Sequence, residues 1–195
     1  MALFRALESS LPEGRRLFYD PYAVHLLPRP GRLLARAARF PPLGAAIRGT
    51  LYRLWPGARS AGVARTRTID EAVLGALLEG ADQVVLLGSG FDARAHRLRE
   101  LRLAKVFELD RQGTLAAKRA RLNASGLPLS DRVVWVEADL ARRPVLEALG
   151  RQGFDATRPA VFVWEGVTNN LDPASVHLTL RALASCRAGS VVIFT

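Results

Sequence analysis

The chain has 195 residues, of which 49% are hydrophobic and 24% charged, an ordinary globular composition that supports one domain with a substantial core. No run of 18 apolar residues occurs, and charges interrupt the N-terminus too often for a secretory signal. We therefore expect no membrane partner. A single cysteine, Cys186, excludes an internal disulfide and fits a reducing environment, so we expect a cytoplasmic protein.

The formal net charge is +10, carried by 26 arginines and only two lysines, Lys105 and Lys118. The arginines are scattered along the chain, and no basic segment with interleaved aromatic residues occurs, so we do not expect a nucleic-acid partner. A solvated basic surface is the simpler interpretation, and an anionic substrate stays open.

Residues 1–62 are rich in proline, arginine and leucine, and the prolines divide their helical patterns into short pieces. Leu17–Leu27 contains an Asp-Pro helix start followed by apolar spacing. We interpret this region as a helical N-terminal cap on a ligand-binding domain at residues 63–195. None of the histidines has a second ligand at metal spacing, so we expect no metal site; they are His25, His96 and His177.

From Ile69 the pattern is regular, and helical segments alternate with short apolar runs rich in β-branched residues. This alternation predicts an α/β fold with a doubly wound, mostly parallel sheet that helices cover on both faces. The predicted strands are Gln83–Gly88, Lys105–Asp110, Val133–Asp139, Ala160–Gly166 and Ser190–Thr195. The predicted helices between them are Ala93–Leu101, Gly113–Ala124, Pro144–Leu149 and Pro173–Cys186.

The first apolar run ends in Gly88, Ser89 and Gly90, small residues that allow a sharp turn and a close approach to a ligand. The run matches the dinucleotide fingerprint G-x-G-x-x-A, and Asp110 follows about 20 residues later, as that fingerprint requires. Asp92, however, lies where a pyrophosphate would meet the start of a helix, and a carboxylate there disfavours phosphate.

A carboxylate follows each of the first four predicted strands, namely Asp92, Asp110, Asp139 and Glu165. In a parallel α/β sheet the ligand lies at these carboxyl ends, near the switch in strand order. Four acids repel a pyrophosphate but suit a ligand with cationic character and with hydroxyl and amine donors. S-adenosylmethionine has a cationic sulfonium and ammonium, two ribose hydroxyls and an adenine amine. We predict that Asp110 accepts from its ribose hydroxyls and Asp139 from its adenine amine, while Asp92 and Glu165 face its methionine end.

An arginine is needed for the methionine carboxylate, and Arg65 or Arg67 is suitably placed before the first regular helix. Acids at strand ends also cap the helices that follow them. For Asp172, which directly precedes Pro173, we favour this capping role.

Several motifs in this order resemble the leucine carboxyl methyltransferase-like class I methyltransferases, a group that includes bacterial polyketide O-methyltransferases. They are DPYA (20–23), ARTRTID (64–70), QVVLLGSGFDAR (83–94), VFELD (106–110), EADL (137–140) and WEGVTNNL (164–171). The resemblance implies a Rossmann-like methyltransferase sheet that binds S-adenosyl-L-methionine. It implies that Arg65 contacts the methionine carboxylate and that Gly88 lies beneath the cofactor. It also implies that Asp110 holds the ribose, that Asp139 and Leu140 flank the adenine, and that Glu165 lies by the methionyl end.

Three features depart from the family pattern. Ala93 replaces a threonine, and Asn170 replaces a tyrosine. The chain stops at Thr195, whereas the family's fold continues with two further strands, so we expect C-terminal strands to be missing. We therefore expect an unprotected edge strand at residues 190–195 that favours self-association.

These observations predict an S-adenosylmethionine-dependent methyltransferase that modifies a carboxylate or hydroxyl oxygen of a small molecule or a protein terminus. No catalytic residue is identified from the sequence. Two alternatives stay open, a non-catalytic adenosyl-binding fragment and an NAD-binding oxidoreductase domain.

Overall fold

The computed structural model describes residues 1–141 and 144–195, which form two compact units. The N-terminal unit comprises Met1–Asp70, Phe91–Arg97 and Ala120–Leu129. The sheet unit comprises Glu71–Gly90, Leu98–Arg119 and Ser130–Thr195. Two short segments from later in the chain thus belong to the N-terminal unit. The division between residues 62 and 63 rests on composition and stays a prediction.

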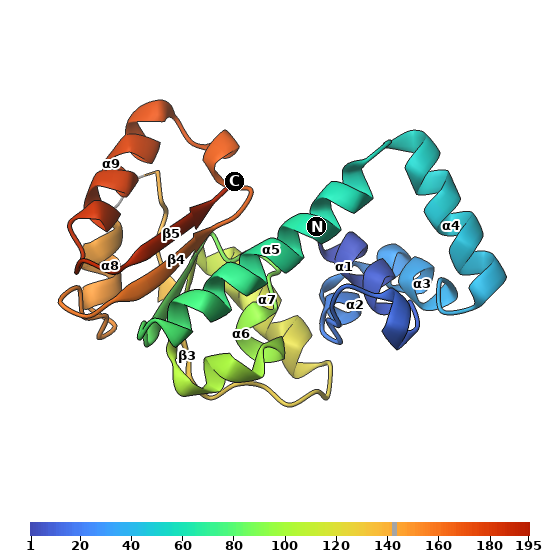
Figure 1. The fold of residues 1–195 in the computed structure, drawn as a ribbon, viewed down its shortest axis with the longest axis horizontal. Coiled ribbons are helices and arrows are strands. Elements are labelled where there is room, and N and C mark those ends of the chain that lie inside the picture. The colour runs from blue at the N-terminus through green and yellow to red at the C-terminus, as the bar shows by residue number, and fades with distance from the viewer. Residues whose placement is uncertain (142–143) are drawn as a thin grey trace. The chain divides into compact units, whose positions relative to one another are not determined.

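Five parallel strands in the order β3-β2-β1-β4-β5 form the sheet (Figure 1). They are β1 (Gln83–Leu87), β2 (Lys105–Asp110), β3 (Val133–Glu137), β4 (Ala160–Trp164) and β5 (Val191–Phe194). The chain runs from β1 outward to β2 and β3, and then returns to place β4 on the other side of β1. The predicted doubly wound parallel sheet is confirmed, and its switch in strand order lies between β1 and β4.

One face of the sheet packs against α8 (Val145–Gly150) and α9 (Pro173–Ala184), drawn in orange and red in Figure 1. Alternate strand residues point to the same side, so Phe107 and Phe162 both enter this core. Phe154 packs between them, with its ring centroid 5.6 Å from that of Phe107 and 5.8 Å from that of Phe162. A compact aromatic and aliphatic core therefore fixes this side of the sheet.

Glu108 of β2 points to the opposite face, since its neighbours Phe107 and Leu109 both enter the core beneath α8 and α9. It pairs with Lys118 of α7 (Gln112–Asn123), and both side chains are 0% exposed. Removing two charges from water is costly, so each depends on the other for compensation. Helices on both faces explain why β1 and β4 are buried along their whole length.

The N-terminal unit is helical, as predicted. It contains α1 (Ala2–Ser9), a 3₁₀ turn (Glu13–Arg15), α2 (Ala23–Leu26), α3 (Arg29–Ala37), α4 (Pro41–Leu54), the first part of α5 (Ala58–Leu78) and α6 (Arg94–Arg97). Prolines occupy the first turn of α3 and of α4, where the missing amide hydrogen costs nothing. Asp20 starts α2 by accepting hydrogen bonds from the amides of Tyr22 and Ala23, at 3.1 and 2.9 Å.

The helix predicted over Ala93–Leu101 is wrong in extent, because two short pieces, α6 and a 3₁₀ helix over Arg99–Leu103, replace it. Leu98 between them is extended, with φ −83° and ψ 115°, and this conformation interrupts the helical hydrogen bonds. Arg94 and Arg97 are both held by buried ion pairs. Charge pairing, which the apolar pattern does not report, fixes the conformation of this segment.

In the described chain, β3 and β5 are the edge strands of the sheet. Phe194 on β5 is 59% exposed. The association of two chains through this edge stays a prediction.

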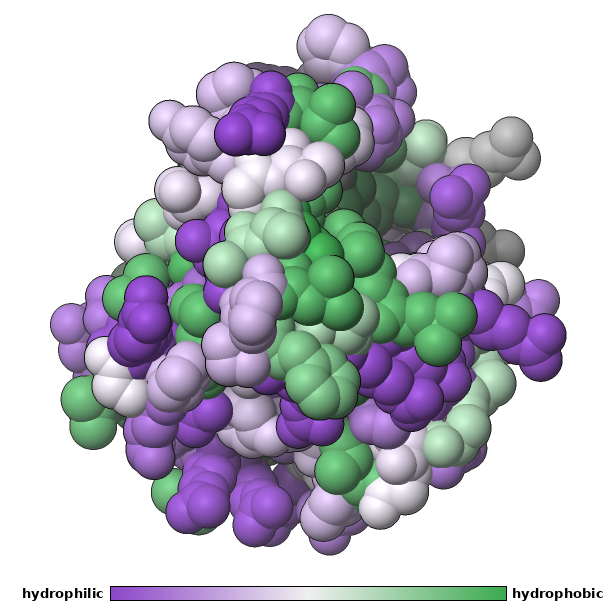
Figure 2. Space-filling view, turned by 90° about the vertical axis from the view of Figure 1, so that its right-hand side faces the viewer, coloured by the Kyte–Doolittle hydropathy of each residue, from purple (hydrophilic) through white to green (hydrophobic). Residues whose placement is uncertain are grey.

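Helix α4 of the N-terminal unit exposes several large apolar side chains, among them Leu43, Tyr52 and Leu54. Figure 2 views the molecule from the side of α4 and shows apolar residues interleaved with polar ones on this face. Across residues 1–141 and 144–195, no helix has both the length and the apolar character that crossing a bilayer requires.

Candidate functional site

The predicted glycine loop directly follows β1, and its conformation requires glycine at two positions. Gly88 has φ +64° and Gly90 has φ +44°, values that side-chain-bearing residues rarely adopt. A Cβ atom on Gly88 would lie 2.5 Å from Cγ2 of Val167, in the loop after β4. The two loops are therefore in direct contact at the switch in strand order.

Asp110 at the end of β2 holds this loop in place. Its Oδ2 accepts a hydrogen bond of 2.7 Å from the amide of Gly90, and its Oδ1 accepts one of 2.7 Å from the amide of Arg111. The amide of Ser89 donates to the carbonyl of Leu109 at 3.0 Å and continues the β1–β2 pairing into the loop. The acid predicted 20 residues after the glycines thus contacts the glycine loop directly.

Ser89 lies between the two glycines, and its side chain is 5% exposed. Within the described residues, its hydroxyl oxygen is buried and has no hydrogen-bond partner. Burial of a hydroxyl without a hydrogen-bond partner costs free energy relative to its hydration in water. A hydrogen bond to a polar ligand atom would offset this cost.

The other two predicted acids of the sheet unit lie at the same edge, because parallel strands place their carboxyl ends together. Asp139 follows β3, is half-buried, and accepts a hydrogen bond from the amide of Ala141 at 3.0 Å. Leu140 packs partly against the core beneath α8 and α9. Glu165 follows β4 and is half-buried. The edge therefore carries, in order, Asp139, Asp110, the glycine loop and Glu165.

The two remaining predicted site residues, Arg65 and Asp92, belong to the N-terminal unit. Arg65 lies on α5, and its guanidinium contacts the sulfur of Met1 at 2.9 Å. Arg67, the alternative arginine, donates to the carbonyl of Leu17 at 3.0 Å. The Asp92 carboxylate accepts from the amide of Arg94 at 2.8 Å and forms an ion pair with its guanidinium.

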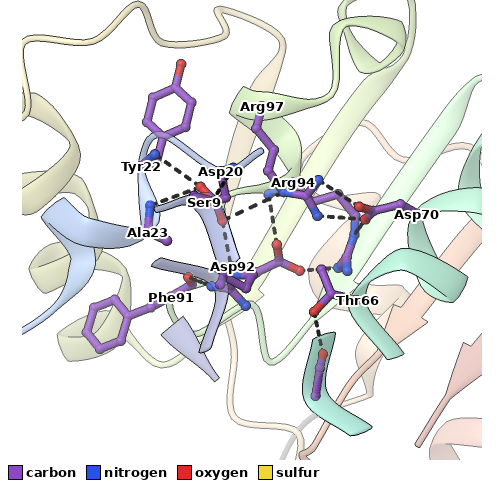
Figure 3. A network of polar contacts seen from close by, with 12 residues as sticks. Ser9, Asp20, Tyr22, Ala23, Thr66, Asp70, Phe91, Asp92, Arg94 and Arg97 are labelled. Carbon is purple, nitrogen blue, oxygen red and sulfur yellow. Dashed lines mark hydrogen bonds and ion pairs between the residues drawn. The ribbon is translucent and has the colours of Figure 1, made fainter. Parts of the chain in front are cut away.

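Asp92 and Arg94 are part of a buried network of charges in the N-terminal unit (Figure 3). Arg94 Nε donates to Asp70 Oδ1 at 2.9 Å. Arg97 binds both oxygens of the Asp70 carboxylate, each at 2.7 Å. The side chains of Arg94, Arg97 and Asp70 are 1%, 2% and 6% exposed. Two guanidinium groups therefore share one carboxylate out of contact with water.

The network continues to the N-terminal helices through Asp20. Arg5 Nε donates to Asp20 Oδ2 at 3.1 Å, and Arg97 Nε lies 3.8 Å from the same oxygen. Arg5 also donates to the carbonyl of Phe91, the residue directly after the glycine loop. This network fastens the segment after the loop to α1, α2 and α5, and no sequence pattern predicted it. Several of its residues lie in the motifs DPYA, TID and DAR. These motifs carry the family resemblance, but they do not indicate which charges pair.

Asp172 has the predicted capping role. It accepts from the Ser175 amide at 2.9 Å and from the Ser175 hydroxyl at 2.6 Å. These hydrogen bonds, with that from the hydroxyl the largest cause, hold the pKa of the Asp172 carboxyl below its ordinary value. Among residues 1–141 and 144–195, no three histidine, cysteine or acidic side chains are grouped so as to hold a metal ion.

The carboxyl edge of the sheet can therefore bind a ligand that donates hydrogen bonds and carries positive charge. Each carboxylate oxygen has two acceptor sites, and the backbone amides at Asp110 occupy one on each oxygen. Anionic groups such as a pyrophosphate would be repelled by Asp110, Asp139 and Glu165 together.

Known proteins resemble this chain in sequence. A protein of Streptomyces coelicolor named "Putative S-adenosyl-L-methionine-dependent methyltransferase" is 39% identical over 171 residues, covering 86% of this chain and 54% of its own length. A protein of the same description from Saccharopolyspora erythraea is 34% identical, covering 99% of this chain and 64% of its own length. The chain spans about half the length of the first of these relatives.

Solved structures share the fold. The structure of a Thermobifida fusca protein has a TM-score of 0.55 at 19% identity, with 98% of this chain and 64% of that chain covered. A DUF574 family protein from Streptomyces avermitilis has a TM-score of 0.58 at 19% identity, with 89% and 66% covered. The leucine carboxyl methyltransferase family matches residues 1–184. The chain therefore belongs to the leucine carboxyl methyltransferase family.

Proposed function

We propose that the sheet unit binds S-adenosyl-L-methionine at the carboxyl ends of β1 to β4, and that the protein transfers the methyl group to an oxygen acceptor. The observation that carries this proposal is the contact of the Asp110 carboxylate with the glycine loop, at 2.7 Å from the Gly90 amide. This contact brings together the two parts of an adenosine-binding fingerprint, the glycine loop and the acid about 20 residues after it. Relatives named as S-adenosyl-L-methionine-dependent methyltransferases support the same ligand.

Asp110 supplies the ribose contacts in this proposal. Backbone amides occupy one acceptor site on each of its oxygens, which leaves one site on each for a ribose hydroxyl. A neighbouring pair of hydroxyls matches such a carboxylate, because it offers two donors at a similar spacing. The bonds to the amides also fix the rotation of the carboxylate before the ligand arrives, which reduces the entropy lost on binding.

The neighbouring strand ends supply the contacts to the two ends of the cofactor. Asp139 accepts from the adenine amine, and Leu140 offers an apolar surface to the adenine ring. Glu165 faces the positively charged methionyl end, and the buried hydroxyl of Ser89 gains a polar partner. From the resemblance, Arg65 binds the methionine carboxylate and Gly88 lies beneath the cofactor. From its place after the glycine loop, Asp92 faces the methionine end.

When bound, the sulfonium of the cofactor supplies an electrophilic methyl group. The residues of the chain bind and orient the cofactor and exclude water, which is the main requirement for an in-line displacement. A carboxylate acceptor is already a nucleophile and needs no general base. We propose a carboxylate or hydroxyl oxygen of a small molecule or a peptide terminus as acceptor, and we assign no catalytic residue.

An NAD-binding oxidoreductase is the second candidate, on the strength of the G-x-G-x-x-A run and Asp110. A phosphate bound after such a loop relies on the start of a long helix. Here α6 has only four residues, and a carboxylate, Asp92, precedes it. Three carboxylates along the edge also oppose a pyrophosphate. Both observations favour the sulfonium cofactor.

Isothermal titration calorimetry with S-adenosylhomocysteine and NAD tests the proposal. We expect saturable binding of S-adenosylhomocysteine and no measurable binding of NAD. Tighter binding of NAD would overturn the cofactor assignment. A radiolabelled methyl-transfer assay against carboxylate and hydroxyl acceptors then separates an enzyme from a non-catalytic adenosyl-binding protein.

A further inference from the structure

The N-terminal unit contains a cavity of about 250 Å³ between α1, α2 and α3. A liquid water molecule occupies about 30 Å³, so the cavity has room for a small organic molecule. One part of its lining is apolar and consists of Ala6, Pro21, Val24, Ala35 and Leu127. The other part is polar and consists of Ser9, Ser10, Tyr19, Asp20, His25, Arg36 and Arg39.

The charges that line this cavity are mainly positive. The guanidinium groups of Arg36 and Arg39 form no hydrogen bond and no ion pair with any residue that the structure describes. Asp20 is the one acid in the described lining, and its carboxylate is engaged by Arg5, by Arg97 and by backbone amides (Figure 3). Two cationic groups therefore border the cavity without a compensating anion.

The start of α3 positions Arg36, and Arg39 lies just beyond the C-cap Ala38, where its amide donates to the carbonyl of Arg36 at 3.1 Å. Arg32, one turn into the helix, donates to the carbonyls of His25 at 3.1 Å and of Leu27 at 3.4 Å. Pro28 and Pro30 restrict the backbone at the same place. Arg36 then follows one turn after Arg32 on the same side of the helix, because residues four apart are neighbours.

We propose that this cavity binds a small organic anion, whose carboxylate or phosphate contacts Arg36 and Arg39 and whose short apolar part packs against Val24, Ala35 and Leu127. Arginine suits this role because its planar fork of donors matches oxyanions. Both guanidinium groups are exposed at the cavity. The site is therefore open to solvent, and each arginine contributes to the binding free energy about as much as an exposed ion pair does. The proposal does not depend on methyl transfer.

His25 lines the same cavity and reports on its occupancy. Burial, followed by the positive charges of Arg32 and Arg36, lowers the pKa of its imidazole below the ordinary value. Tyr19 and Asp20 line the cavity from the preceding segment. An anion bound beside His25 would offset the arginine charges and favour the imidazolium, so the pKa of His25 would rise.

NMR titration of the histidine ring signals in the intact chain tests this proposal. The probes are sodium butyrate and inorganic phosphate, with butyramide as a neutral analogue of butyrate and sodium chloride at matched ionic strength. His177, on α9 of the sheet unit, is the internal reference. We expect a saturable shift of the His25 signal and a higher pKa with either anion, and neither effect with butyramide. A response to butyrate alone would assign a carboxylate ligand, and a response to phosphate alone would assign a phosphate ligand.

The variants Arg36→Gln and Arg39→Gln should each weaken anion binding by about fivefold, as for an exposed ion pair. Arg29→Gln, on the same helix but outside the cavity lining, is the matched control and should bind normally. Circular dichroism establishes that all three variants are folded. The proposal is overturned if sodium chloride reproduces the His25 response, if no anion shifts the signal, or if a variant that combines Arg36→Gln with Arg39→Gln binds as tightly as the wild type.

Discussion

Asp70, within α5 of the N-terminal unit, and Asp110, at the end of β2 in the sheet unit, are both aspartates, but their surroundings differ. Asp70 is 4% exposed and its oxygens face the guanidinium groups of Arg94 and Arg97. Asp110 is half-buried and, among the residues that the structure describes, accepts only from backbone amides. A carboxylate that is already neutralised stabilises the fold, whereas one with spare acceptor sites can bind a ligand. The partners of a charged residue, more than its type, decide which role it has.

The largest effect should follow from Asp70→Ala, which leaves Arg94 and Arg97 buried without their shared carboxylate. We expect the free energy of unfolding to fall by about 3–5 kcal/mol, as for one partner removed from a buried ion pair. Urea denaturation followed by circular dichroism measures it. The control is Glu147→Ala, which breaks the exposed pair with Arg151 and should cost less than about 0.5 kcal/mol. Equal losses of stability in the two variants would show that the buried ion pairs of Asp70 stabilise the fold no more than the exposed pair of Glu147 does.

Substitutions in the glycine loop should have the next largest effect. Gly88→Ala adds a Cβ against Val167 to an unfavourable φ of +64°, and should cost about 2–4 kcal/mol of stability. Gly90→Ala shares the unfavourable φ, but its Cβ would meet only the Gly88 carbonyl oxygen at 3.8 Å, an ordinary contact, so it should cost about 1–2 kcal/mol. Adding Val167→Ala should recover part of the Gly88→Ala loss and none of the Gly90→Ala loss. Thermal melts that rank Gly90→Ala as the more harmful change would contradict the packing described here.

Asp110→Ala should mainly affect ligand binding. We expect the affinity for S-adenosylhomocysteine to fall about 10- to 100-fold, since a hydrogen bond to a charged group contributes about 1.5–3 kcal/mol. The free energy of unfolding should fall by only about 1 kcal/mol, because the Gly90 amide loses its acceptor. Calorimetry and urea denaturation of the same samples separate the two effects. If binding is unchanged while stability falls as far as in Asp70→Ala, Asp110 is structural.

The smallest effect concerns Asp172, a surface carboxylate whose pKa is lowered by the hydrogen bonds from Ser175. Because the folded pKa lies below the unfolded one, the stabilisation is present above the unfolded pKa and is lost as the pH falls through the folded pKa. Asp172→Ala should therefore lower the Tm slightly at neutral pH and have no effect in strong acid. Melting curves of both proteins across this pH range should converge on acidification. A difference that is independent of pH would show that the charge of Asp172 is irrelevant.

The sheet and its edge were predictable because they depend on local patterns. Apolar runs rich in β-branched residues located the five strands, and the crossover rule ordered them as parallel. The spacing from Gly90 to Asp110 predicted a shared site, and the two residues are in contact. Parallel strands place their carboxyl ends together, so no long-range information was needed to bring Asp139 and Glu165 to the same edge.

The buried charge network was not predictable in the same way. Apart from Asp92 with Arg94, its pairs join residues 15 to 86 positions apart, such as Arg5 with Asp20 and Arg5 with the carbonyl of Phe91. A chain with 26 arginines offers many partners for each aspartate, and spacing does not select among them. Arg94 and Arg97 of the short α6 both belong to this network, and Leu98 directly after them is extended, so the helix predicted over Ala93–Leu101 was too long.

The discontinuous composition of the N-terminal unit also bears on its synthesis. Leu26 accepts a hydrogen bond from Arg121, and the Tyr22 hydroxyl donates to the carbonyl of Pro128. At about 5–20 residues per second, a ribosome adds residues 120–129 roughly 3–12 s after residue 70. The first helices of the chain are thus made early, but their unit is completed only after two strands of the sheet have been synthesised. During that interval Leu26 and Tyr22 lack the partners that Arg121 and Pro128 supply in the folded chain.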